Sequence, residues 1–524
     1  MRKRLALLIG MIVAGCGTAP ALQETMTLTM ATAEPAKLAF AFPSPRGFGL
    51  PVPVALDLGP MPTLKVAPQT ILGRSNSHLL GWCRNHVTGH CDNLNGKLVA
   101  MRELQPTWGD GKALYRIGHG ITDGRSDYAY MTGYHFEQCW NVRDQYPYDD
   151  IRGGIEEADA MGADQIHVVN FGTSDPQEAA RYVSYLDHVG DANRLRYPST
   201  AAGARLFELG NEIAMKRERG HETWAPDEKV YAARAREFAL AMRQAADGPI
   251  QIGAVASVNS NWEGDGWSGG ADTVKHLIEG MGDQVDFLIF HGYPAWPVVR
   301  EGDLASVLAQ NEWNRKQLED VIWPAIQATG RPVGIANTEF STNLYSDPLH
   351  ARGMFGALFA ADSVALAMNQ RLLAAAEFCF SHDDHADAGF FYDDDPARPT
   401  PIYAFERMLA KHWGDVRVAA TATEVPTQTV TGARGQIQLP LLATTAAASQ
   451  DGSRAYMLVV NRSNDQEVRC RVDFGFPPAG VTAYTLASPL GWDAKDASVT
   501  TQAVASLAPY GFQRASVTIL EARR

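Results

Sequence analysis

The stretch LFELGNEI, residues 206–213, is the most informative part of the sequence for the fold. It is a short apolar run that ends at Gly210, and an amide and a carboxylate follow directly, Asn211 and Glu212. Burying either polar side chain without a partner costs on the order of a few kcal/mol, and an ionised acid costs far more. A buried strand that ends in this way therefore indicates either exposed residues or the edge of a functional site.

Other short apolar runs end in polar residues in the same way. They are ILGRSN (71–76), ALYRIGHG (113–120), QIHVVNFG (165–172), IQIGAVAS (250–257), DFLIFHGY (286–293), VGIANTEF (333–340) and LLAAAEFCFSH (372–382). Near-continuous apolar runs are typical of parallel strands buried on both faces. Amphipathic helical patterns lie between them, so the alternation predicts an α/β fold, a (β/α)8 TIM barrel over residues 71–414.

The pattern changes after the barrel. Residues 415–524 contain short β-type runs separated by turn residues, such as AYMLVVNRS and EVRCRVDFG, and these predict a C-terminal β-sandwich domain. We expect residues 51–70 to supply strands that join this sandwich, because a barrel brings its two ends close together.

The N-terminus has the pattern of an export signal. A basic start, an apolar run too short to span a bilayer and the sequence VAGC follow one another, and VAGC resembles a bacterial lipobox. The resemblance implies a lipoprotein signal peptide over 1–15, lipidation of Cys16, and a Pro-rich tether over 16–50. We therefore expect an exported bacterial lipoprotein, attached by the lipid to the periplasmic or cell-surface face of a membrane. An ordinary signal peptide with an incidental cysteine is the alternative.

Composition excludes some classes of partner. The 524 residues are 45% hydrophobic and 20% charged, which is ordinary for a globular protein, and the formal net charge is 46 − 59 = −13. No block of Lys and Arg interleaved with aromatic residues occurs, so the sequence argues against nucleic acid as a partner.

Five cysteines follow Cys16, namely Cys83, Cys91, Cys139, Cys379 and Cys470. In CRNHVTGHC (83–91), a local disulfide between Cys83 and Cys91 is the favoured interpretation. Free thiols and a metal site remain as alternatives, although the spacing is not that of a standard zinc site. The odd count leaves at least one thiol unpaired in a monomer.

Two carboxylates stand at predicted strand ends, Glu212 on the fourth strand and Glu339 on the seventh. The carboxyl ends of barrel strands share one face, so these acids should meet there. A protonated and an ionised carboxyl group facing each other can cleave an acetal. Arg116 and Tyr293 would support Glu339 as the nucleophile, whereas Glu212 would be the general acid and base. This chemistry needs no metal and no organic cofactor.

The same motifs resemble a known group of enzymes. LGNEI, HGYP and TEF, on the fourth, sixth and seventh strands, resemble the clan A glycoside hydrolases. The segments VVNFGTSDPQEAARYVSYL (168–186) and PIYAFERMLAKHWGD (401–415) are similar to glycoside hydrolase family fifty-one, the α-L-arabinofuranosidases. Families thirty-nine and seventy-nine have a similar frame.

The resemblance implies a carbohydrate substrate and a retaining, double-displacement reaction of α-L-arabinofuranosidase type. A β-xylosidase or other clan A glycosidase, or an inactive carbohydrate-binding lipoprotein, is the alternative. It implies catalytic Glu212 and Glu339, with substrate-binding residues Asn211, Arg116, His119, Asn170, His291 and Tyr293. His119 departs from the family pattern, which has a glycine there. The acidic stretch 381–395 could bind a cation, contact sugar hydroxyls or be a solvated loop.

Overall fold

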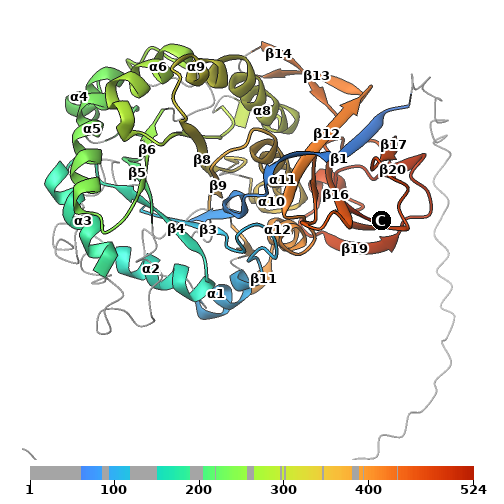
Figure 1. Ribbon diagram of the computed structural model, residues 1–524. Coiled ribbons are helices and arrows are strands. Elements are labelled where there is room, and N and C mark those ends of the chain that lie inside the picture. Colours follow the sequence, from blue (N-terminus) through green and yellow to red (C-terminus); the bar gives the residue numbers. More distant parts are fainter. Residues whose placement is uncertain are drawn as a thin grey trace, which may run out of the picture. The chain divides into compact units, whose positions relative to one another are not determined.

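Eight parallel strands close into a barrel in the computed structural model (Figure 1). The described residues are 61–84, 94–118, 150–188, 205–216, 218, 220–256, 265–295, 298–299, 302–344, 347–379, 389–392, 395–432 and 435–524. The predictions for the signal peptide, the tether and Cys16 lie outside them.

The barrel strands follow one another in chain order, and the last pairs with the first. They are β2 (Gly81–Cys83), β3 (Leu114–Ile117), β4 (Asp164–Val169), β5 (Leu206–Leu209), β6 (Gln251–Val255), β7 (Phe287–His291), β8 (Gly334–Phe340) and β9 (Ala374–Glu377). One layer of apolar side chains, including Leu114, Ile166 and Phe287, forms a buried cluster of its own. The predicted TIM barrel is confirmed.

Helices follow most of the strands. They are α1 (Leu94–Arg102), α2 (Asp150–Met161), α3 (Pro176–His188), α4 (His221–Trp224), α5 (Glu228–Ala245), α6 (Gly270–Met281), α8 (Leu304–Gln317), α9 (Trp323–Ala328), α10 (Pro348–Arg352), α11 (Met354–Asn369) and α12 (Pro401–Lys411). Helix α5 begins where the Asp227 carboxylate accepts hydrogen bonds from the amides of Lys229 and Val230, a standard N-cap. No helix in the described ranges is both long and apolar enough to cross a membrane.

The prediction that residues 71–76 form the first barrel strand is wrong. Residues 71–74 are the end of β1 (Thr63–Arg74), which pairs with β12 (Val416–Thr423) and β17 (Val468–Asp473) in the C-terminal sheet. The first barrel strand is the three-residue GWC of β2, too short to form a recognisable apolar run. It lies so close to β9 that a Cβ on Gly81 would stand 2.4 Å from the carbonyl oxygen of Ala375.

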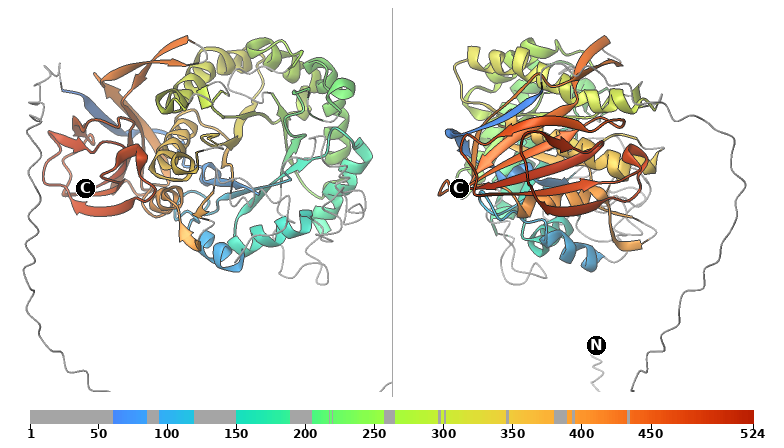
Figure 2. Two further views of the ribbon diagram at one scale, coloured as in Figure 1. Left: turned by 180° about the vertical axis from the view of Figure 1, so that it is seen from behind. Right: turned by 90° about the vertical axis from the view of Figure 1, so that its right-hand side faces the viewer.

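The C-terminal domain is a mainly antiparallel sheet of nine strands, ordered β19-β18-β21-β16-β15-β12-β1-β17-β20. Its further strands are β15 (Leu442–Ala448), β16 (Arg454–Asn461), β18 (Gly480–Ala487), β19 (Ser498–Ala503), β20 (Tyr510–Phe512) and β21 (Ser516–Arg523). Figure 2 shows β1, in blue, among these orange and red strands. Ala483 of β18 and Cys470 of β17 stand near opposite ends of this order, yet they belong to one apolar cluster, so the sheet folds over on itself.

Two short hairpins complete the described strands. The first pairs β10 (Phe391–Tyr392) with β11 (Asp395–Pro399), and the second pairs β13 (Thr427–Gly432) with β14 (Gly435–Pro440).

Helix α11 joins the barrel to this sheet. It contacts β8 and β9 on the barrel and β15, β16 and β21 on the sheet, which explains why nearly all its residues are buried. Asp362 on the helix receives two hydrogen bonds, of 2.6 and 3.0 Å, from the guanidinium of Arg462. Both side chains are almost inaccessible, so the ion pair fixes the two domains against each other.

Candidate active site

Polar side chains from four barrel strands meet at the carboxyl ends of those strands. Arg116 lies on β3, Glu208 on β5, His291 at the end of β7 and Glu339 on β8. Asn211 and Glu212 follow β5, and Tyr293 follows β7. All except Tyr293 are at most 8% exposed. Burial of so many charged groups is tolerated only where they pair with one another.

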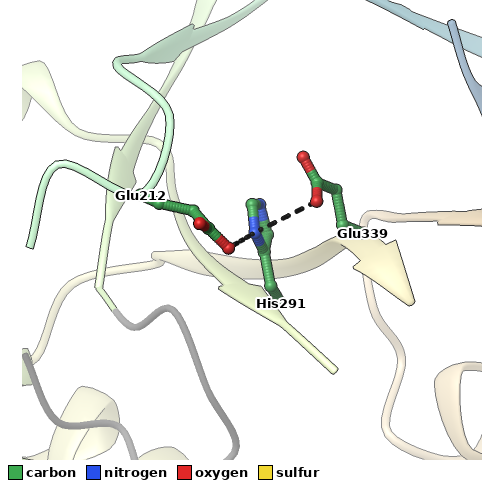
Figure 3. A group of neighbouring side chains, drawn as sticks. All are labelled: Glu212, His291 and Glu339. Atoms are coloured by element: carbon green, nitrogen blue, oxygen red, sulfur yellow. Dashed lines mark hydrogen bonds and ion pairs between the residues drawn. The ribbon is translucent and has the colours of Figure 1, made fainter. Parts of the chain in front are cut away.

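The backbone after β5 turns sharply. Gly210 has a φ of 88°, which suits a residue without a side chain, and Glu212 has a φ of 46°. A left-handed conformation at a residue other than glycine costs of order 1–3 kcal/mol and is found where the surroundings hold it in place. The turn places the carboxylate of Glu212 toward His291 (Figure 3).

Strand β8 carries an irregularity at the same level. Phe290 pairs with Asn337, but the next residue, His291, pairs with Glu339, so one residue of β8 is passed over. The pairing with β9 shifts at the same place. An extra residue of this kind re-aims the side chains that follow it. Here it brings Glu339 level with His291.

Glu212 and Glu339 face each other across the ring of His291, as Figure 3 shows. His291 Nδ1 lies 3.0 Å from Glu212 Oε1 and 3.5 Å from Glu339 Oε2. One oxygen of each carboxylate and the ring nitrogen all lie within 4.8 Å of one another. Retaining glycosidases hold their two carboxyl groups about 5–5.5 Å apart, and the oxygens of Glu212 and Glu339 that face His291 lie at a comparable distance.

Both oxygens of Glu339 have a donor. Arg116 Nη1 donates to Oε1 at 2.6 Å, and the Tyr293 hydroxyl donates to Oε2 at 2.8 Å. Hydrogen bonds to the charged form and an adjacent cation both favour an ionised carboxylate. The structure thus gives Glu339 the surroundings that a carboxylate nucleophile requires.

Arg116 has two further partners. Nε and Nη2 together hold the carboxylate of Glu208 at 2.8–3.1 Å, and Nη2 also donates to Asn211 Oδ1 at 2.9 Å. Glu208 is not among the residues predicted from the sequence to lie in the site. Its signal was present nonetheless, because Glu208 stands two residues after an inward-facing leucine, as Arg116 does on β3.

The cluster shifts the pKa values of its members. Burial lowers the pKa of His291, but the charge of Glu339 and the hydrogen bond and charge of Glu212 outweigh burial, so its pKa is raised. Burial likewise opposes the charge on Arg116, yet Glu208 and Glu339 hold its pKa well above the usual value. The imidazole of His291 is in hydrogen-bond contact with Glu212, so this acid also has a titratable neighbour.

Cys83 ends β2 beneath this cluster. It is a free, fully buried thiol whose Sγ lies 3.1 Å from the carbonyl oxygen of Thr338, so the predicted disulfide with Cys91 is wrong. The physical reason is that β2 places Cys83 inside the barrel wall. Burial raises the pKa of the thiol well above its usual value, and the charge of Arg116 only partly opposes that. Cys470 is also a free, buried thiol.

The remaining predictions have different outcomes. Asn170 is 2% exposed and its side chain bonds to the amide and hydroxyl of Thr173, which shapes the turn after β4. His119, Cys91 and Cys139 lie outside the described residues, and so do 381–388 and 393–394 of the acidic stretch.

Glu212, His291 and Glu339 also form the one group of side chains in the described part of the chain that could hold a metal ion. A cation there would occupy both carboxylates, and the guanidinium of Arg116 already stands 2.6 Å from Glu339.

Comparison with solved structures defines the fold. The family fifty-one α-L-arabinofuranosidase of Thermotoga petrophila RKU-1 matches with a TM-score of 0.64 and 18% identity, over 88% of this chain and 100% of that one. The family fifty-one α-L-arabinofuranosidase of Bifidobacterium longum matches with a TM-score of 0.65 and 14% identity, over 89% and 99%. The family forty-four endoglucanase of Clostridium acetobutylium ATCC 824 matches with a TM-score of 0.57 and 8% identity, over 88% and 99%.

No protein-family model matches the sequence, and neither does any curated protein. The solved structures nevertheless confirm the resemblance to family fifty-one as a similarity of fold. It covers both the barrel and the C-terminal sheet.

Proposed function

We propose that this protein is a retaining glycoside hydrolase that acts on glycosides derived from polysaccharides, with α-L-arabinofuranosidase-like activity. One observation carries the proposal: the carboxylates of Glu212 and Glu339 face each other within 4.8 Å, and Glu339 is held by Arg116 and Tyr293. The fold shared with arabinofuranosidases from two bacteria supports the choice of sugar.

The reaction would proceed in two displacements. Glu339 attacks the anomeric carbon while Glu212 donates its proton to the leaving oxygen, and a covalent ester forms on Glu339. Glu212, now ionised, then takes a proton from water, which attacks the same carbon and releases the sugar. The ring of His291 donates to Glu212 Oε1 at 3.0 Å and stabilises this ionised form.

Asn211 would position the sugar. Its Oδ1 accepts from Arg116 at 2.9 Å, which fixes the plane of the amide. We assign the amide nitrogen to the sugar 2-hydroxyl, beside the reacting carbon. A hydrogen bond at that hydroxyl strengthens as positive charge develops in the transition state.

Hydrolysis of 4-nitrophenyl α-L-arabinofuranoside, with the β-D-xyloside and β-D-glucuronide as comparisons, tests this function. Glu339→Ala should abolish turnover, because no nucleophile remains. Glu212→Ala should slow turnover about 10²–10⁴-fold. Azide, which needs no base, should then restore its turnover and yield the glycosyl azide of retained configuration.

Circular dichroism of both variants should match the wild type. Normal hydrolysis by Glu339→Ala would overturn the assignment. A wild-type protein that binds sugars but cleaves none of the glycosides would favour a carbohydrate-binding protein instead.

We also propose that the protein is an exported lipoprotein, with a thioether-linked diacylglycerol on Cys16, on the evidence of the VAGC pattern. Radioactive palmitate supplied to expressing bacteria should label the wild-type protein. Cys16→Ser should carry no label, and a labelled Cys16→Ser would contradict the anchor.

A further inference from the structure

Glu208 is the one member of the cluster that the proposed reaction does not use. It is fully buried on β5, and each of its described hydrogen bonds goes to Arg116. Arg116 Nε lies 3.1 and 3.0 Å from its two oxygens, and Nη2 lies 2.8 Å from Oε2. A carboxylate buried this deeply requires a purpose beyond stability, because a buried ion pair by itself is often no better than apolar packing.

The charge of the site changes during a double displacement. In the free enzyme Arg116 is balanced by two carboxylates, Glu208 and Glu339. In the covalent intermediate Glu339 is an ester and carries no charge. Without Glu208, Arg116 would then be a buried cation with no counter-ion, a strongly unfavourable state.

We propose that Glu208 is the permanent counter-ion of Arg116, and thereby a positioning residue for both displacement steps. The inference rests on the proposed retaining reaction and deepens it. Glu208 keeps Arg116 neutralised whether Glu339 is a carboxylate or an ester. The positive charge that develops on the sugar in both transition states is therefore not opposed by a bare guanidinium.

The geometry of the guanidinium gives Glu208 a second effect. Because Nε and Nη2 grip one carboxylate as a fork, the plane of the group is fixed. That plane directs Nη1 to Glu339 and the other hydrogen of Nη2 to Asn211. Through Arg116, Glu208 thus orients both the nucleophile Glu339 and the amide of Asn211 that is assigned to the sugar, without contacting either of them.

Glu208→Gln tests the charge with little change of shape, and Glu228→Gln is the matched control. Glu228 is also a buried glutamate, 2% exposed, but it lies at the start of α5 and bonds to Ser268 and His276, outside the cluster. Glu208→Gln should lower kcat/KM for 4-nitrophenyl α-L-arabinofuranoside about 10- to 100-fold, the usual effect of losing a hydrogen bond to a charged group. Glu228→Gln should leave it nearly unchanged.

The pH profile separates positioning from a merely structural role. The titratable and charged groups that face Glu339 lie on or just after β2, β3, β5 and β7: Cys83, Arg116, Glu212, His291 and Tyr293. With Glu208 neutral, more of the charge of Arg116 acts on Glu339, so its pKa should fall. The acidic limb of kcat/KM should then move to lower pH by about one unit. Glu208→Asp, which keeps the charge, should restore the limb.

A second readout needs no substrate. With Glu208 neutral, the less balanced Arg116 should lower the pKa of His291 in ¹⁵N-histidine NMR, with the resonance assigned from its loss in His291→Asn. Glu228→Gln should leave it in place. An unchanged acidic limb and an unchanged His291 pKa in Glu208→Gln would overturn the inference. A wild-type protein without hydrolysis, but with the His291 shift, would overturn the proposed function and leave the pairing of Glu208 with Arg116 standing.

Discussion

The barrel contains two buried pairs of glutamates, and they differ in one respect. Inside the barrel, Glu208 and Glu339 both bind the guanidinium of Arg116. Between β9 and α12, Glu377 and Glu406 are equally buried, and no cation bonds to either among the described residues. Glu406 receives a hydrogen bond of 2.5 Å from the indole of Trp82, and Glu377 Oε2 has no partner in the described part of the chain.

The pKa values of Glu406 and Glu377 reflect the absence of a bonded cation. Burial raises the pKa of Glu406 to about 8, and the hydrogen bond from Trp82 opposes the rise only in part. Burial, followed by the charge of Glu406, raises the pKa of Glu377 well above its usual value. Burial without a cation therefore favours the protonated form of Glu377 and Glu406, whereas the guanidinium of Arg116 offers Glu208 and Glu339 the positive charge and hydrogen bonds that favour an ionised form. One arginine, Arg116, thus suits the inner pair, Glu208 and Glu339, to catalysis. The outer pair, Glu377 and Glu406, has no such partner among the described residues.

Arg116→Met should have the largest effect, because it removes the group that distinguishes the two pairs of glutamates. It removes the guanidinium that both Glu208 and Glu339 bind but keeps most of the volume, so Glu208 loses its one described ion-pair partner. We expect turnover to fall by more than about 10³-fold and the free energy of unfolding at pH 7 to fall by about 3–5 kcal/mol. Urea unfolding followed by circular dichroism would measure the second effect.

The same variant should acquire a new pH dependence. Its buried acids would have raised pKa values, so the folded state would bind more protons and stability would fall as pH rises. Arg205→Met is the control, because its ion pair with Asp187 is partly exposed and should contribute less than about 1 kcal/mol. If Arg116→Met unfolds with the pH dependence of the wild type, the guanidinium does not set the charge of the inner pair.

The sequence was informative where a strand is long and ends in polar residues. The runs that end at Asn211, Tyr293 and Glu339 predicted both the barrel and the meeting of these side chains at its mouth. This signal is strong because, when strands and helices alternate regularly, the carboxyl ends of all the strands lie on one face of the barrel.

The features that escaped prediction are those set by three-dimensional packing. Strand β2 has three residues and its cysteine suggested a disulfide, so its place in the barrel could not be recognised. Strand β8 passes over one residue where it pairs with β7, and nothing in the sequence of β8 indicates this irregularity. Glu208 was hidden inside an apolar run, since its need for a partner becomes visible only when Arg116 is known to face it.

Glu406→Gln, in the pair without a cation, should have a smaller effect. The folded pKa of Glu406 is raised from 4.5 to about 8, so between these values the folded protein holds a proton that the unfolded chain has lost. The contribution of Glu406 to stability should therefore be fully present below about pH 4.5 and decline as pH rises, by at most about 1.4 kcal/mol per pH unit. Glutamine stays neutral and its carbonyl can still accept from Trp82. The variant should thus match the wild type near pH 5 and be the more stable protein at pH 8.

Urea unfolding at several values between pH 5 and 8 measures the slope for each protein. Glu103→Gln is the control, because Glu103 forms an exposed ion pair with Arg407, on the same helix as Glu406. Its slope should equal that of the wild type. Some slope should survive in Glu406→Gln, since Glu377 is still present, and its pKa should be less raised once the charge of Glu406 is gone. Parallel curves for Glu406→Gln and the wild type would mean that the outer pair is already ionised, and that burial without a cation does not keep these acids protonated.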